Sequence, residues 1–481
     1  MWHELTDRLW IGGEWIAPAG QRTIPVISPY TEQEITTVPD GSKADIDRAV
    51  GAARRAFDEG PWARMPLVER IGVLEALSGE LAGVEEQMAR TVSAEMGAPI
   101  SDAYSIHTTR ARGILDAMID LARVYPFESV RESASGRARV LRRPVGVVAT
   151  IVPWNAPHLN IMQKLAPALL AGCTMVVKPS PETPLDAILL AQALDRAGLP
   201  QGVVNIVPAG REVGEYLVTH PGVDKVSFTG STTAGRRIGS LCGALVRPCT
   251  LELGGKSAAI LLDDADLAEV LPAVVRGAYR NTGQVCSAKT RILVPAHRET
   301  EIVDGLAGLV GDLIVGDPAS PATEIGPLVT SAHRERVERM VASGIRDGAT
   351  PVTGGGRGRV PDRGWFTDPT LFAAVTPRMT IAREEIFGPV ATVIAYRDTD
   401  DAIAIANDTD YGLSGSIFGA DVERAEGIAT RIRTGVVEIN GNPTGFTAPM
   451  GGVKRSGIGR EMGPEGFDAF VEITALGLPP R

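Results

Sequence analysis

The stretch GVVATIV at residues 146–152 is a short run rich in β-branched residues, and a helical pattern follows it at residues 160–170. A run of this length between turn residues predicts a buried strand. The same alternation continues, with β-branched runs at residues 174–177, 203–207 and 223–228 and helical patterns at residues 184–197 and 211–219. Such an alternation predicts a parallel, doubly wound sheet with helices on both faces.

A second alternation follows residue 286, with β-branched runs at residues 291–294, 391–395 and 435–440. We therefore expect an α/β protein with two doubly wound lobes and a boundary near residues 252–255. The N-terminal third is expected to be helical, with Ser42 capping a helix, because apolar residues recur there at helical spacing. At residues 128–143 polar and apolar residues alternate, which predicts an exposed hairpin.

The composition limits the classes of function. A chain of 481 residues is too long for one ordinary core, and 44% hydrophobic with 22% charged residues is typical of a globular protein. A net charge of −10 argues against a nucleic-acid partner. The longest apolar run, residues 165–177, is too short to cross a membrane, and the N-terminus does not resemble a secretory signal. We expect no membrane association and a cytoplasmic location.

The cysteines and histidines do not suggest a disulfide framework or a metal site. The four cysteines, Cys173, Cys242, Cys249 and Cys286, have no paired spacing, and the six histidines form no ligand pattern. An isolated cysteine is usually a buried, inert thiol, and Cys173 lies in an apolar run that fits this description.

Three short motifs hold residues suited to covalent chemistry on a carbonyl group. LELGGK at residues 251–256 contains Glu252, GQVC at residues 283–286 ends on Cys286, and PWN ends on Asn155. A thiolate can add to an aldehyde, an amide can stabilise the oxyanion, and a carboxylate can activate water. Burial between two leucines is expected to raise the pKa of Glu252 towards a useful range for a general base. Since no histidine neighbours Cys286 in the sequence, any lowering of its pKa must come from backbone dipoles and a positively charged cofactor.

Together these motifs resemble the aldehyde dehydrogenase superfamily. The likeness covers nearly the whole chain, down to PMGGVKRSGIGRE at residues 449–461, where Met450 replaces the usual phenylalanine. The resemblance implies NAD(P)-dependent oxidation of an aldehyde to a carboxylic acid, through a thiohemiacetal and then a thioester on Cys286. It implies that the catalytic residues are Cys286, Glu252, Asn155 and Lys178.

A glycine-containing turn, GSTTAG at residues 230–235, lies between a predicted strand and a predicted helix. Backbone N–H groups in such a turn can face a phosphate, although the spacing is not the usual dinucleotide fingerprint. The resemblance makes this turn the pyrophosphate site and adds residues for the riboses and the nicotinamide. The expected cofactor-binding residues are Ile151, Trp154, Lys178, Gly230, Ser231, Gly235, Leu253, Glu385 and Phe387.

The choice between NAD and NADP depends on the residues after Lys178. Many NAD-preferring family members have a glutamate three residues after this lysine, where it repels a 2′-phosphate. This chain has Pro181 there, followed by Glu182. Because Glu182 could take the same role, we expect the chain to use NAD. Arg211 lies beyond the following predicted strand and could approach a 2′-phosphate, so NADP is the alternative cofactor.

The substrate pocket is expected to be wider and more tolerant of polar groups than one built for acetaldehyde. Ala156 stands where the family often has an aromatic residue, and Asn160 and Gln163 stand where bulky apolar residues are common. Whether these two amides face the tunnel, the solvent or another subunit stays open at this point. The lack of an aromatic cluster disfavours betaine aldehyde. The expected pocket residues are Ala156, Leu159, Asn160, Gln163, Val285 and Ser287.

The resemblance also implies a domain division and an assembly. Residues 1–126 and 145–253 would form the dinucleotide-binding domain, and residues 254–456 the catalytic domain. Residues 127–144 and 466–481 would form a small β arm that joins subunits into a homodimer or homotetramer.

Two alternative functions are compatible with these motifs. In a coenzyme A-acylating dehydrogenase the thioester would pass to a thiol, but that acceptor needs no water-activating base such as Glu252. A non-enzymatic binding or structural protein with the same fold would have no chemical reason to keep Cys286, Asn155 and Glu252 together.

Overall fold

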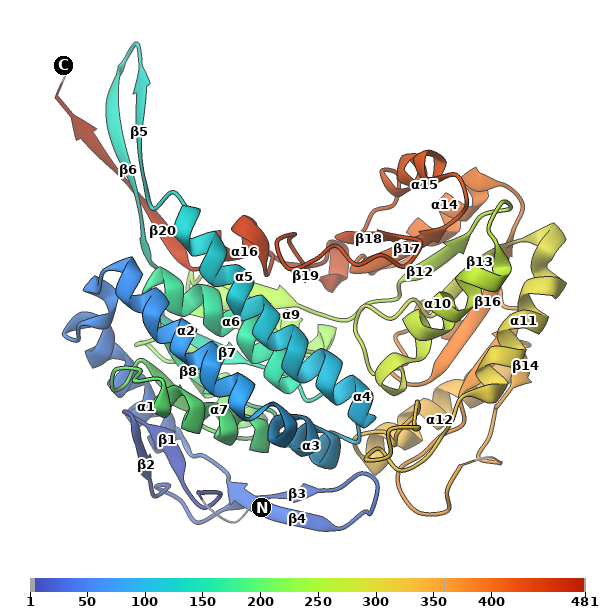
Figure 1. Ribbon diagram of the computed structural model, residues 1–481, viewed down its shortest axis with the longest axis horizontal. Helices are drawn as coiled ribbons and strands as arrows, with labels where there is room; N and C mark the ends of the chain where they lie inside the picture. Colours follow the sequence, from blue (N-terminus) through green and yellow to red (C-terminus); the bar gives the residue numbers. More distant parts are fainter. Residues whose placement is uncertain (1–4, 359, 480–481) are drawn as a thin grey trace.

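The computed structural model describes residues 5–358 and 360–479. Two α/β lobes face each other, and a narrow β arm projects from the first of them (Figure 1). The expected fold class, two doubly wound α/β lobes with a small β arm, is confirmed.

The first sheet has eight strands. In spatial order they are β19 (Gly457–Ile458), β11 (Cys249–Glu252), β10 (Lys225–Thr229), β7 (Val147–Ile151), β8 (Thr174–Lys178), β9 (Val204–Ile206), β1 (Leu9–Ile11) and β2 (Glu14–Ile16). The strands β11, β10, β7, β8 and β9 run parallel, as the alternation of strands and helices predicts.

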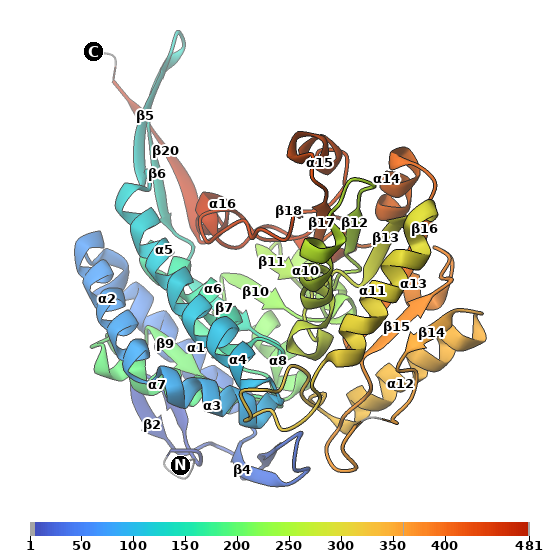
Figure 2. The same ribbon diagram turned by 45° about the vertical axis from the view of Figure 1, so that its right-hand side comes forward.

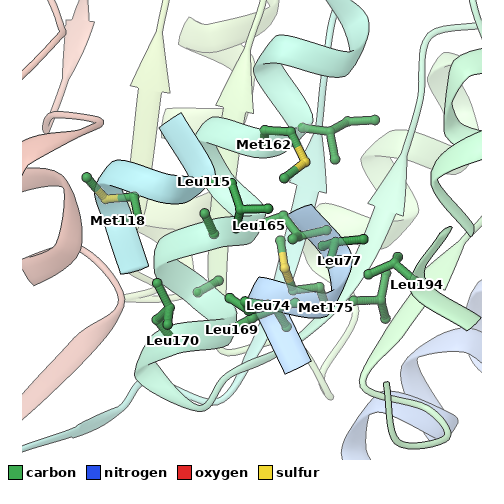
Figure 3. Close-up of a cluster of buried hydrophobic side chains, with 14 of the residues drawn as sticks. Leu74, Leu77, Leu115, Met118, Met162, Leu165, Leu169, Leu170, Met175 and Leu194 are labelled. Atoms are coloured by element: carbon green, nitrogen blue, oxygen red, sulfur yellow. The ribbon is translucent and has the colours of Figure 1, made fainter. Parts of the chain in front are cut away.

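Helices cover both faces of this sheet, which makes it doubly wound. Strand β7 shows why, since Val148 packs into one apolar cluster while Val147 and Ala149 pack into the other. The helices of the first face are α2 (Leu67–Gly83), α5 (Arg110–Val124), α6 (Pro157–Ala171) and α7 (Leu185–Arg196). Those of the second face are α1 (Lys43–Asp58), α8 (Arg211–Thr219) and α9 (Thr232–Ala244). Figure 3 shows part of the first cluster, where Leu165 and Leu169 of α6 lie near Leu74 and Leu77 of α2.

The second lobe is built on a seven-stranded sheet. Its order is β14 (Thr350–Thr353), β15 (Thr370–Ala373), β16 (Val390–Tyr396), β13 (Arg291–Pro295), β12 (Ala258–Leu261), β17 (Ser414–Phe418) and β18 (Val436–Ile439). Helices α10 (Leu267–Tyr279) and α11 (Glu299–Asp312) pack on one face. On the other face lie α12 (Ser331–Arg346), α13 (Thr380–Arg383), α14 (Thr399–Asn407) and α15 (Val422–Ala429).

The arm is a three-stranded antiparallel sheet. Its order is β20 (Val471–Leu478), β6 (Gly136–Pro144) and β5 (Glu128–Ser133), so the hairpin expected at residues 128–143 is confirmed. The short helix α16 (Gly463–Asp468) leads into β20. Figure 2 shows the arm extending beyond both lobes.

The expectation of helices throughout the N-terminal third is wrong for residues 9–39. That segment forms β1 and β2 and a separate hairpin of β3 (Thr23–Ile27) with β4 (Glu34–Pro39). Gly12 and Gly13, with φ of +70° and +81°, make the tight turn between β1 and β2. Helices begin at α1, where Ser42 caps the first turn as expected, and continue with α3 (Glu85–Met96) and the short α4 (Ile100–Asp102).

Candidate active site

Glu252 is the last residue of β11, where the chain leaves the first sheet for the second lobe. Its side chain is 6% exposed, and its Oε1 has no hydrogen-bond partner among the described residues. The loop before β19 closes over it, because a Cβ at Gly451 would lie 2.6 Å from Oε1. A buried carboxylate oxygen without a partner is placed to bind a water molecule or a reacting group.

Cys286 follows a turn that has an unusual backbone. Asn281 and Thr282 both have positive φ, at 54° and 58°. This backbone conformation costs about 1–3 kcal/mol for each residue that is not glycine. Asp102 fixes the turn by accepting a hydrogen bond from the Asn281 backbone N–H at 2.8 Å. The turn leaves Cys286 only partly buried. The backbone strain of this turn therefore lies next to Cys286, the predicted nucleophile.

Asn155 lies against this turn. Its Nδ2 donates to the Gln284 carbonyl oxygen at 3.0 Å, and its own carbonyl accepts from Nδ2 of Asn281 at 3.0 Å. One hydrogen of the Asn155 amide is used in the first contact, which leaves the second for another acceptor. The structure therefore brings Asn155 to the Cys286 loop although the two residues are far apart in the sequence.

Two glycines allow three segments of the chain to meet. A Cβ at Gly255 would lie 2.5 Å from the Cys286 carbonyl oxygen, and a Cβ at Gly254 would collide with the Glu385 carboxylate. The Gly255 backbone N–H donates to Glu385 Oε1 at 2.9 Å. The LELGGK motif thus joins the predicted base, the predicted nucleophile and the predicted ribose-binding acid.

The electrostatic environment favours the neutral forms of all three groups. Burial raises the pKa of Glu252 well above its usual value, and the neighbouring Glu461 adds to this shift. Burial likewise raises the pKa of Glu385. Although Cys286 is partly exposed as a residue, desolvation of its thiol raises the pKa to about 12, with smaller contributions from Glu385 and Glu252. A positive charge at this site would therefore be needed to stabilise a thiolate.

Phe387 lies in an aromatic group with Trp154 and His333. The ring centroids of Trp154 and Phe387 are 5.4 Å apart, and those of Trp154 and His333 are 5.3 Å apart. Phe387 has a φ of +62°, and its carbonyl oxygen lies 2.7 Å from His333 Nε2. This contact helps to hold a backbone conformation that phenylalanine rarely adopts.

The GSTTAG turn connects β10 to α9, as expected. Ser231 caps α9, because its Oγ accepts a hydrogen bond from the Ala234 N–H at 3.3 Å. Gly235 is required by packing, since a Cβ there would collide with the side chain of Leu253. The free N–H groups of the first helical turn and the helix dipole make this end of α9 suited to a phosphate.

Lys178 ends the neighbouring strand β8, where it pairs with Ile151 of β7. Its Nζ donates to the carbonyl oxygens of Ala209 at 2.7 Å and Pro179 at 3.0 Å. Burial lowers its pKa to about 8. Lys178 and Ile151 are thus at the carboxyl ends of parallel strands, where ligands of such sheets bind.

The expected pocket residues have different environments. Asn160 is buried and donates its amide to the Ala156 carbonyl oxygen at 2.8 Å, one turn earlier on the same helix. Gln163 is half-buried and its Nε2 lies 3.9 Å from the Met462 sulfur. Leu159 packs at the edge of the first apolar cluster. Ala156 is buried, whereas Val285 and Ser287 on either side of Cys286 are half-buried.

Sequence reasoning missed an ion pair behind Glu252. Lys164 Nζ lies 2.5 Å from Glu461 Oε1 and donates to Thr229 Oγ1 at 2.6 Å, and both charged side chains are buried. The only available signal was a lysine in the middle of a helix that is mostly apolar. Its partner lies 297 residues away, so spacing could not identify it.

Sequence reasoning also missed the support beneath Glu385. The Arg336 guanidinium of α12 donates to the carbonyl oxygens of Glu385 and Ile386, both at 2.6 Å. Arg336 and His333 therefore hold the segment that contains Glu385 and Phe387. A run of charges on α12 looks like an ordinary exposed helix face in the sequence.

Within residues 5–358 and 360–479 no group of three or more His, Cys, Asp or Glu side chains is arranged to hold a metal ion. In the same part of the chain no helix is long and apolar enough to cross a membrane.

Comparison with known proteins defines the class to which this fold and site belong. Residues 15–476 match the model of the aldehyde dehydrogenase family. The chain is 46% identical over 473 residues to geranial dehydrogenase of Castellaniella defragrans, covering 98% of both chains. The chain therefore belongs to the aldehyde dehydrogenase family, and the expected reaction class, NAD(P)-dependent aldehyde oxidation, is confirmed.

Two solved structures are similar over nearly their whole length. One is an aldehyde dehydrogenase of Mycobacterium tuberculosis complexed with NAD+, with a TM-score of 0.97, 45% identity and 98% coverage of both chains. The other is a mutant of aldehyde dehydrogenase C from Pseudomonas syringae, complexed with NAD+ and octanal. It has a TM-score of 0.96 and 42% identity, and the match covers 98% of this chain and 97% of that one.

Proposed function

We propose that this chain oxidises an apolar aldehyde to the carboxylic acid, with NAD as the hydride acceptor and Cys286 as the nucleophile. The observation that carries the proposal is the position of Gly255, which touches the Cys286 carbonyl and binds the Glu385 carboxylate three residues after Glu252. A base, a thiol and a ribose-binding acid thereby converge at one point between the lobes.

The residues present fit a dinucleotide. Ser231 caps a helix whose first turn can receive the pyrophosphate, with Gly230, Gly235 and Leu253 shaping the turn. Lys178 and Ile151 would line the adenosine side, and Trp154, Glu385 and Phe387 the nicotinamide side. When bound, NAD supplies a hydride acceptor and a positive charge close to the thiol. That the relatives named above were crystallised with NAD+ supports this assignment.

The chain's own residues would act in sequence. The Cys286 thiolate adds to the aldehyde carbon, and the second hydrogen of the Asn155 amide and the Cys286 N–H receive the oxyanion. One such donor contributes about 3 kcal/mol to transition-state stabilisation. After the oxidation step a thioester remains on Cys286. Glu252, whose pKa is raised and whose Oε1 has no hydrogen-bond partner in the described part of the chain, then takes a proton from the water that hydrolyses the thioester.

NAD is the preferred cofactor in this proposal because of Glu182. Its carboxylate accepts a hydrogen bond from Ser180, and its charge opposes the larger effect of burial, which lowers the pKa of Lys178; Glu182 therefore lies close to that lysine. A negative charge there repels a 2′-phosphate. We expect Glu182→Gln to raise kcat/KM with NADP about tenfold, equivalent to about 1.4 kcal/mol, while Glu212→Gln on the exposed start of α8 changes neither cofactor's rate. An unchanged NADP rate in Glu182→Gln would contradict this role.

The substrate is proposed to be an aldehyde on a hydrocarbon chain. One hydrogen of the Asn160 amide is used by the Ala156 carbonyl within the same helix, and Leu159 adds an apolar surface. The small side chain of Ala156, which follows Asn155, takes less volume than the aromatic residue that the family often has there. The names of the relatives point the same way, since geranial and octanal are both aldehydes on hydrocarbon chains.

The test is the formation of reduced nicotinamide with NAD or NADP across aliphatic, aromatic and polar aldehydes. Cys286→Ala should lower the rate to about one thousandth or less while NAD still binds. Glu252→Gln should release about one equivalent of reduced cofactor and then slow to about one hundredth or less, because the thioester persists. A steady wild-type rate in Glu252→Gln would remove this residue as the base, and a requirement for coenzyme A would favour the acylating alternative.

The proposal includes an oligomeric assembly and a cytoplasmic location for this chain. The exposed edges of β20 and β5 suit pairing between subunits, in a homodimer or a homotetramer. All four cysteines are free thiols, which fits the reducing cytoplasm.

A further inference from the structure

Arg110 begins α5 and has a positive charge that no acid of the described chain pairs with. Its side chain is half-buried, and across residues 5–358 and 360–479 its guanidinium takes part in no ion pair or hydrogen bond. The guanidinium carbon lies 5.6 Å from the centre of the Phe446 ring, so the group rests on an aromatic surface. Glu438 acts on Arg110 from a longer distance, and its carboxylate is paired with Lys289 at 2.8 Å. A half-buried cation without a counter-charge is placed to receive an anion.

The segment before Arg110 connects it with the turn that holds the predicted nucleophile. This segment is the π-helical turn Ala103–Thr109, which follows Asp102 at the side of the first lobe that faces the second (Figure 1). The Asp102 carboxylate accepts hydrogen bonds from the Arg280 guanidinium and the Asn281 backbone N–H, both at 2.8 Å. Asp102 is therefore already engaged by another arginine. Burial and the positive charge of Arg280 both lower the pKa of Arg110.

The loop that contains Phe446 leads from Arg110 to the predicted base. One end of this loop packs on α5, because a Cβ at Gly113 would lie 2.6 Å from Cε2 of Phe446. Its other end lies against Glu252, since a Cβ at Gly451 would lie 2.6 Å from Oε1. A backbone step from residue 446 to residue 451 spans at most about 18 Å. The guanidinium is thus within reach of the far end of an extended substrate whose aldehyde meets the thiol.

A second polar side chain lies beside the same loop. Gln163 Nε2 lies 3.9 Å from the Met462 sulfur, and a thioether is only a weak acceptor. Met462 precedes Gly463, where a Cβ would lie 2.9 Å from the Thr447 carbonyl oxygen. Gln163 therefore borders the loop one residue from Phe446. Its amide can add a hydrogen bond to an anion that Arg110 binds.

We propose that Arg110 recognises a carboxylate at the far end of the substrate's hydrocarbon chain, so that the preferred substrates are ω-oxo carboxylic acids. The inference rests on the function proposed above and narrows its substrate class, because the reacting end and the hydrocarbon chain are the same. The planar guanidinium can give two parallel hydrogen bonds to the two carboxylate oxygens while Phe446 supports it. The chemistry at Cys286 is unchanged, and the product is a dicarboxylic acid.

The experiment compares three substrates of equal length, at about five to ten carbons, with the full-length chain and NAD. These are the ω-oxo acid, its methyl ester and the unsubstituted aldehyde. We expect kcat/KM for the acid to exceed that for the ester about tenfold. Arg110→Met should lower kcat/KM for the acid about thirtyfold more than for the unsubstituted aldehyde, mainly through KM, as expected for the loss of charge-assisted hydrogen bonds. Arg110→Lys should recover part of the difference, because it restores the charge without the planar fork.

The matched control is Arg123→Met, which removes the same charge about 20 Å further along α5. The Arg123 side chain is 47% exposed and pairs with Glu75 on the surface, so this change should leave the ratio of acid to aldehyde unaltered. A wild-type preference for the unsubstituted aldehyde at every length would overturn the inference without any variant, and the proposed function would stand. An equal loss for acid and aldehyde in Arg110→Met would also overturn it. If none of the three substrates is oxidised, the proposed function fails together with the inference.

Discussion

At the scale of single residues, the pH dependence of the proposed base depends on two buried charges behind it. Glu461 raises the pKa of Glu252, whereas Lys164 and Arg460 lower it. Glu252 must be ionised to activate water, so activity rises as the pH passes through its pKa. We expect Glu461→Gln to move the acid limb of the kcat profile down by about one pH unit, and Lys164→Met to move it up. Shifts of the same sign in both variants would contradict this account.

The control for these variants is Glu465→Gln, which changes an exposed acid four residues away and should leave the profile unmoved. A further readout is the stability of the variants, since removing either partner leaves the other buried without its counter-charge. The pH profile, unlike overall activity, does not move for a purely structural loss. It therefore tests the charge effect itself.

The sequence predicted the chemistry of the site better than its support. The motifs around Cys286, Glu252 and Asn155 are local, so residue type and neighbours are sufficient to select these three residues as candidates. The pair of Lys164 and Glu461 joins positions 297 residues apart, and only the fold brings them together. Whether Asn160 faces the substrate stays a prediction, because its hydrogen bond to the Ala156 carbonyl oxygen uses only one hydrogen of the amide.

At the scale of elements, α7 depends on a carboxylate from another helix. Pro184 offers no side-chain cap, and Glu95 of α3 accepts the N–H groups of Leu185 at 2.9 Å and Asp186 at 3.2 Å instead. Burial raises the pKa of Asp186 to about 8, and burial and Asp186 together raise that of Glu95. Two carboxyl groups therefore share a dry site at the start of one helix.

This arrangement makes stability fall as the pH rises. A carboxyl group whose pKa is higher in the folded state contributes stability below its unfolded pKa, and this contribution is lost as the pH rises through the folded value of about 8. The loss is about 1.4 kcal/mol per pH unit for one proton. We expect Asp186→Asn to raise the apparent Tm relative to wild type more at pH 8.5 than at pH 6. Asp195→Asn, exposed on the same helix, should show no such difference, and an equal effect at both pH values would contradict the argument.

Elements with strong periodicity were predicted well, and those defined by tertiary contacts were not. Helix α8 spans residues 211–219 as expected, because its apolar residues recur at regular spacing. Strands β1 to β4 were missed, since each is short; β1 and β2 lie at the edge of a sheet built from residues far along the chain, and β3 and β4 form a separate two-stranded sheet. Local propensity has little influence on such strands.

At the scale of the whole molecule, the β arm is the part whose surface is least explained by the single chain. It extends away from both lobes (Figure 1), and Ile473 on its outer strand β20 is 66% exposed. Val130 and Leu476, 49% and 38% exposed, lie in one row across the arm, because each pairs with Arg139. Apolar side chains on a thin sheet with open edges fit an interface with another subunit.

We therefore expect Ile473→Asp to weaken assembly. A charge on the outer strand would be buried without a partner if a second subunit covers it, which costs several kcal/mol. Sedimentation velocity should show a smaller species at micromolar concentration, with an unchanged circular dichroism spectrum. Val68→Asp is the matched control, because Val68 is equally apolar, 71% exposed and on α2 of the main body. If Ile473→Asp sediments like the wild type, or if both chains are monomers, the arm is not the assembly surface. If only Val68→Asp dissociates, that surface lies on α2 instead.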